Sequence, residues 1–154
     1  MTNGEYKSYY ENGQLWVHAF KNNGVFHGEY KKYHSNGELR IHAFLDDGEI
    51  HGEYKLYHTN GQLDTHAFNN HGEYHGEYKS YDSNGQRLVH AFYDNGKYHG
   101  EFKLYDIDGQ LDTHAFYDYN RDITHSIKEM AHDITSITNE VKMIIKLKFG
   151  IPCL

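Results

Sequence analysis

Aromatic and polar residues alternate along most of this chain, and the alternation recurs with a period of 24 residues. The unit opens with Gly-Glu-Tyr-Lys, and in the last copy Phe replaces Tyr. The five copies begin at Gly4, Gly28, Gly52, Gly76 and Gly100. A second run, His-Ala-Phe, starts at His18, His42, His66, His90 and His114. A fixed period of this length predicts a repeat architecture, in which stacked neighbours bury what one unit cannot bury alone.

Each unit has the pattern of a β-hairpin. In the first copy a Tyr-rich strand over 5–10 precedes a strand over 14–20, and Asn12-Gly13 lies between them. Asn-Gly between two such runs favours a type I′ turn, because both central residues need positive φ. This turn predicts a register in which Tyr10 faces Leu15, Tyr6 faces Ala19, and Lys7 faces His18.

A second loop, over 21–24, joins each hairpin to the next. Its glycine suits a left-handed backbone position. We therefore expect a mainly β fold over 1–120, an elongated single-layer antiparallel meander of five stacked hairpins. At a strand spacing of ~4.8 Å, ten strands form a ribbon about 45 Å long. The copies span 4–27, 28–51, 52–75, 76–99 and 100–119.

The periodicity changes after Tyr119. Over 121–154 the pattern predicts one long amphipathic α-helix and a short tail, with Asp122 as the N-cap and Gly150 and Pro152 as the stop. We expect the helix either to cover a face or edge of its own sheet or to pair with a second chain, and the uncovered sheet favours the first. The apolar stripe begins at Ile123, and its candidate interaction residues are Ile127, Met130, Ile134, Ile137, Val141 and Ile144.

The repeat unit also resembles a known family. Its sequence, Gly-Glu-Tyr-Lys-x-Tyr-x-x-Asn-Gly-x-Leu, resembles the MORN repeat, in the variant found in bacteria and giant viruses. The resemblance covers about three quarters of the chain and departs from the family in the His-Ala-Phe strand. It implies an elongated, twisted sheet of hairpins that acts as a scaffold for protein interaction or dimerisation, with lipid association in some members. It also implies that the repeat module is not catalytic.

Composition and charge narrow the function classes. The net charge is −7 with neutral histidines, which disfavours a nucleic-acid partner. Cys153 is the single cysteine, so no intramolecular disulfide or cysteine zinc cluster is expected. No signal-peptide pattern and no apolar run of membrane-spanning length occur. We expect an intracellular, cytoplasmic protein, in the host cytoplasm if it is viral.

The 14 histidines are the main candidates for chemistry. If the second loop closes on Phe20 and Val25, the two phased sets face each other in pairs. Two imidazoles and a nearby carboxylate such as Glu29 could bind zinc or copper. The favoured alternative is a semi-polar ladder without metal. The low-ranked metal candidates are His18, His27, His42, His51, His66, His75, His90 and His99. Such pairs also predict a loss of stability as the pH falls through about 6.5, because protonated pairs repel.

No catalytic motif accompanies these residues, and repetition of every candidate acid and base argues against a singular active site. We therefore expect a non-catalytic scaffold without a cofactor, binding either an unidentified protein partner or a second copy of itself. The first alternative is a membrane-associated module that uses the phased lysines, although each lysine follows a phased glutamate and membrane association should be weak or absent. The second alternative is a pH- or metal-responsive module that uses the histidines.

Overall fold

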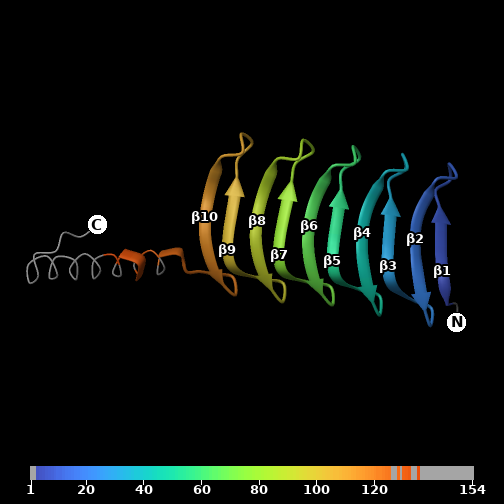
Figure 1. Ribbon diagram of the computed structural model, residues 1–154, viewed down its shortest axis with the longest axis horizontal. Helices are drawn as coiled ribbons and strands as arrows, with labels where there is room; N and C mark the ends of the chain where they lie inside the picture. Colours follow the sequence, from blue (N-terminus) through green and yellow to red (C-terminus); the bar gives the residue numbers. More distant parts are fainter. Residues whose placement is uncertain (1–2, 126–127, 129, 133–134, 136–154) are drawn as a thin grey trace, which may run out of the picture.

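The computed structural model describes residues 3–125, 128, 130–132 and 135. They form one open sheet of 11 antiparallel strands, each hydrogen-bonded to its neighbours in sequence. The strands lie side by side along the long axis of the sheet, with β1 and β10 near its two ends (Figure 1). This arrangement confirms the predicted single-layer meander.

Each 24-residue copy contributes one shorter and one longer connection between consecutive strands. The strands are β1 (Gly4–Tyr9), β2 (Leu15–Asn22), β3 (Val25–Tyr33), β4 (Leu39–Asp46), β5 (Glu49–Tyr57), β6 (Leu63–Asn70), β7 (Glu73–Tyr81), β8 (Arg87–Asp94), β9 (Lys97–Tyr105), β10 (Leu111–Asp118) and β11 (Arg121–Asp122).

Pairing within a hairpin is largely as predicted. Tyr6 faces Ala19, and Lys7 faces His18. The turn itself was wrongly predicted as type I′: Gly13 has φ +82°, but Asn12 does not have positive φ. The Gly13 N–H donates to the Tyr10 carbonyl at 2.9 Å, so the turn is an ordinary β-turn followed by a glycine in the left-handed region. The strand bulges next to it, and Tyr9 rather than Tyr10 faces Leu15.

The type I′ turn lies instead in the second loop. Asn23 and Gly24 have φ of +51° and +85°, and Asn22 pairs with Val25. A bulge then shifts the register, next to Gly28, which has φ +85°. Glycine removes the steric cost of positive φ at such a bulge.

This shift overturns the predicted histidine pairs. His18 faces Lys31 rather than His27, and the same offset separates His42 from His51, His66 from His75, and His90 from His99. The predicted loss of stability near pH 6.5 rested on these pairs and loses its basis.

The core of the described sheet is thin. Its buried hydrophobic residues are small: Val17, Ala19, Ala43, Ala67, Ala91 and Ala115. Each alanine lies across from an aromatic residue, so that Ala67 faces Tyr54 on one side and Tyr78 on the other. The aromatic rings on the neighbouring strands leave each of these alanines at most 5% exposed.

The segment after β10 differs in part from the prediction. Asp122 belongs to β11, and its carboxylate accepts a hydrogen bond from the Thr124 N–H at 2.9 Å. The described residues beyond it include helical positions, but one long C-terminal helix is not confirmed. Met130 is described and is 58% exposed. The other candidate interaction residues lie outside the described residues: Ile127, Ile134, Ile137, Val141 and Ile144.

Candidate functional site

The sheet has two chemically different faces. We call one the aromatic face, because successive strands contribute rings to it that contact one another. We call the other the polar face, because it carries the phased glutamates, lysines and histidines, with the phenylalanines of the His-Ala-Phe run beside them. The aromatic face consists of Tyr6, Phe26, Tyr30, Ile50, Tyr54, Tyr74, Tyr78, Tyr93, Tyr98, Phe102 and Tyr117 together with the aliphatic residues between them.

The aromatic face is hollowed over β3, β4 and β5. The hollow has a volume of about 330 Å³, and its lining is Phe26, Tyr30, Ile41, Ala43, Leu45, Ile50 and Tyr54. A second hollow of about 250 Å³ adjoins it and is lined by Ile50, Tyr54, Asn69, Gly72 and Tyr74. Both lie where the repeat places aliphatic or small residues at positions that hold tyrosine elsewhere.

The same face is filled with rings toward β10. Tyr93 and Tyr98 lie 4.6 Å apart between ring centroids, and Tyr98 lies 5.4 Å from Tyr117. Burial, and then hydrogen bonding with Tyr98, raises the pKa of Tyr93 well above its usual range. Burial also raises the pKa of Tyr54 in the hollow. The repeats are therefore alike in backbone but not in the surface that they present.

On the polar face each copy carries one group of Glu, Lys and His. In the third copy the Glu53 carboxylate contacts the Lys55 ammonium at 2.8 Å and the His66 ring at 2.9 Å. The lysine hydrogen bond, with a further contribution from the histidine, lowers the pKa of Glu53. The other groups are Glu5, Lys7 and His18; Glu29, Lys31 and His42; Glu77, Lys79 and His90; and Glu101, Lys103 and His114.

These ion pairs bear on the roles predicted for the phased lysines and histidines. Every phased lysine is paired with a carboxylate, so the stripe does not present free cations to a surface. Each histidine of this set contacts a glutamate rather than a second histidine. The neighbour of each imidazole is therefore a carboxylate and not the second imidazole that was predicted from the sequence.

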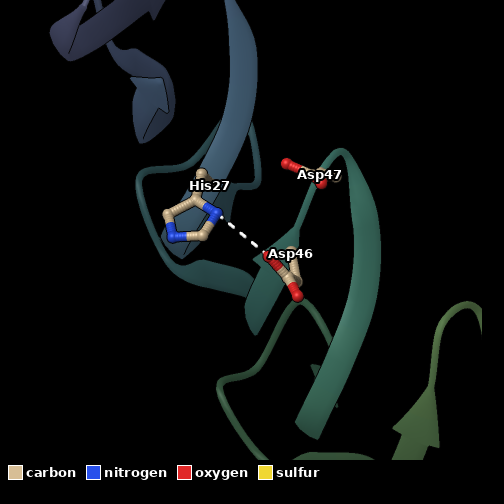
Figure 2. A group of neighbouring side chains, drawn as sticks. All are labelled: His27, Asp46 and Asp47. Carbon is tan, nitrogen blue, oxygen red and sulfur yellow. Dashed lines mark ion pairs between the residues drawn. The ribbon is translucent and has the colours of Figure 1, made fainter. Parts of the chain in front are cut away.

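The second set of histidines lies at the type I′ turns, beside residues that sequence reasoning missed. His27 Nδ1 lies 3.2 Å from Asp46 Oδ1, and Asp47 is close by (Figure 2). His75 and Asp94 are likewise 3.2 Å apart, and His99 and Asp118 are 3.5 Å apart. His51 instead lies with its ring 4.6 Å from that of His71. The glycines at the bulge positions were the signal that could have revealed this register.

The fold, an open sheet built from five similar hairpins, places the protein among the β-repeat arrays. A family model for the MORN repeat variant matches residues 2–20, 26–47, 50–68 and 74–95, which is more than half of the chain. The chain belongs to the MORN repeat family. The fifth copy lies outside the matched ranges, although β9 and β10 continue the same pairing. The search of curated proteins found no match.

In the described part of the chain, we find no helix with the length and apolar character needed to cross a bilayer.

Proposed function

We propose that this chain is a non-catalytic scaffold that binds an apolar segment of a protein on its aromatic face. The observation that carries the proposal is the hollow over β3 to β5, because it is open, apolar and built on a sheet with a single layer. A sheet face of this kind is normally covered by a second layer. Exposed apolar patches that are bordered by polar residues commonly serve as protein interfaces.

The chemistry of the lining suits a protein segment. Phe26, Tyr30 and Tyr54 contribute aromatic rings to the lining. Ile41, Leu45 and Ile50 contribute aliphatic side chains. Aromatic side chains contribute much of the binding energy at interfaces and cost little conformational entropy when they are fixed. The polar face, in contrast, is made of internally paired charges.

Repetition supports a scaffold rather than an enzyme. The Glu, Lys and His groups recur in all five copies with nearly the same contacts. Active sites are usually single and asymmetric, with acid and base in different environments. The roles common among MORN repeats, protein or membrane interaction, are consistent with this.

Two occupants of the aromatic face fit the sequence. The apolar stripe that starts at Ile123 could bind it within one chain or from a second copy, and an unrelated protein could present a similar amphipathic segment. Pairing through such a stripe follows the helix-in-groove mode of recognition.

Site-specific photo-crosslinking tests the proposal. A photoreactive phenylalanine analogue replaces Ile50 in the aromatic face, and in a matched control it replaces Phe44, which is 42% exposed. We expect an adduct at position 50, in cells that express the full chain, and little at position 44. Mass spectrometry of the adduct separates residues 126–154, a second copy and another protein. Equal yields at the two positions would refute the proposal.

Binding to anionic vesicles tests the membrane alternative. Because each phased lysine is paired with a glutamate at 2.7–2.8 Å, we expect no co-sedimentation with phosphatidylserine vesicles at physiological salt. Saturable co-sedimentation would favour the membrane module over the protein scaffold.

A further inference from the structure

One turn of the array brings together three side chains that can all act as metal ligands. They are His27 on β3, Asp46 at the end of β4, and Asp47 in the turn that follows, which we call the His27 cluster. One ligand atom from each lies within 4.8 Å of the others. Figure 2 shows the imidazole and the two carboxylates around a common space beside the turn that follows β4.

The backbone accounts for this convergence. Gly28 pairs with Leu45, which places His27 one position further along, next to Asp46. Asp47 has φ +47° in the type I′ turn, so the chain reverses at that residue and its carboxylate stays close to the strand ends. The cluster is therefore positioned by strand pairing and by a tight turn.

The cluster also carries uncompensated negative charge. In the part of the chain that the structure describes, Asp46 forms an ion pair with His27 alone, and Asp47 forms none. Two adjacent carboxylates and one imidazole attract a divalent cation. Imidazole nitrogen with carboxylate oxygen suits zinc, nickel or cobalt, whereas calcium and magnesium prefer oxygen ligands alone.

The other repeats show how specific the arrangement is. His75 and Asp94 reproduce the 3.2 Å contact of His27 with Asp46, but Asn95 stands where the cluster has Asp47. The paired strands β7 and β8 thus hold two of the three ligands on an equivalent backbone, because Asn95 has φ +46°. Among the described residues, the His27 cluster is the one group of three such ligands.

We infer that the His27 cluster binds one divalent transition-metal ion of the zinc, nickel or cobalt type, with water completing its coordination. This site is separate from the aromatic face and does not depend on the proposed scaffold function. Small movements of the side chains bring the ligand atoms to the metal–ligand distances of about 2.0–2.2 Å that zinc requires. The ion would then join β3 to the turn after β4.

The test uses the full chain, with zinc chloride in isothermal titration calorimetry at about pH 7.5, because metal binding needs deprotonated ligands. We expect one saturable site in the wild type. Asp47→Asn should weaken zinc binding at least about tenfold, because even outer partners of a metal commonly contribute that much. His75→Gln is the matched control and should leave the binding unchanged.

A gain-of-site variant makes the test independent of damage to the fold. Asn95→Asp supplies the missing carboxylate next to His75 and Asp94, and we expect the stoichiometry to rise from one zinc ion to two. Both substitutions use a residue type that the chain already has at the equivalent turn position, so the circular dichroism spectrum should not change.

Paramagnetic cobalt localises the ion in the same protein. We expect the amide signals of residues 26–28 and 45–48 to broaden first in nitrogen-15 correlation spectra. Broadening centred on His51 and His71, unchanged binding in Asp47→Asn, an unaltered stoichiometry in Asn95→Asp, or no saturable zinc binding would each overturn the inference.

Discussion

Replacing Ala67 by leucine tests how the thin core is packed. Ala67 is 1% exposed and lies between Tyr54 on β5 and Tyr78 on β7. Leucine adds three carbon atoms between these two rings, at a position that has almost no exposed surface. Enlarging a side chain in a close-packed site costs about 1–3 kcal/mol. Because both neighbours are affected, we expect Ala67→Leu to lose about 2–3 kcal/mol of unfolding free energy.

Ala115 provides the matched control. It is 5% exposed and faces Phe102 on β9, while on its other side β11 pairs only with Tyr117 and Asp118. The same substitution there meets one ring instead of two, so we expect a loss of about 1 kcal/mol.

Urea unfolding monitored by circular dichroism measures both variants, and hydrogen exchange shows whether the loss is confined to neighbouring strands. Local loss is possible because repeat arrays unfold in parts as well as globally. We expect faster exchange in β5 to β8 of Ala67→Leu, with little change in β1 and β2. Equal losses for the two variants, or a midpoint of Ala67→Leu at or above that of the wild type, would show that the rings do not confine the alanine.

Three further predictions concern the turns and the polar face. Gly100→Ala should lower the melting temperature more than Gly52→Ala, because both have positive φ but only the added methyl at 100 meets Phe92, at 3.3 Å. Glu53→Gln should lower the urea midpoint at about pH 7; since the folded pKa of Glu53 lies below 4.5, its contribution is present above pH 4.5, and the difference from wild type should shrink as the pH falls through the folded pKa. Asn60→Asp keeps the acceptor for the Gln62 N–H but loses the donor to the Ser83 carbonyl, so a stability loss of about 1 kcal/mol is expected in urea unfolding, and an unchanged midpoint would contradict this.

The sequence predicted the meander, the strands and most of the pairing within each hairpin, because these follow from residue alternation and from a period repeated five times; the pair at the turn was wrong, since Tyr9 and not Tyr10 faces Leu15. It did not predict the pairing between hairpins. In the first copy both loops contain asparagine followed by glycine. This dipeptide alone does not distinguish a type I′ turn from a turn with a glycine bulge. Asn23-Gly24 takes the type I′ form, whereas Asn12-Gly13 does not.

The error in the candidate site has the same origin. The turn closes on Asn22 and Val25 rather than on Phe20 and Val25, and the bulge at Gly28 shifts the strand pairing further in the same direction. His18 therefore faces Lys31, not His27 as predicted. A change in register moves every side-chain partner at once, so the site was mispredicted although the strands were not. His27 then meets Asp46, a residue that no motif had marked.

The order of the strands also determines how the protein responds to tension. β1 and β10 lie near opposite ends of the sheet, and the hydrogen bonds between strands run along the line that joins them (Figure 1). A force applied between these ends pulls each strand directly away from its neighbour, and no strand has to slide past another. Because only the few bonds at the loaded edge resist at any moment, we expect hairpins to detach one at a time. Each released hairpin would lengthen the chain by on the order of 70 Å, so the array would extend in steps under tension.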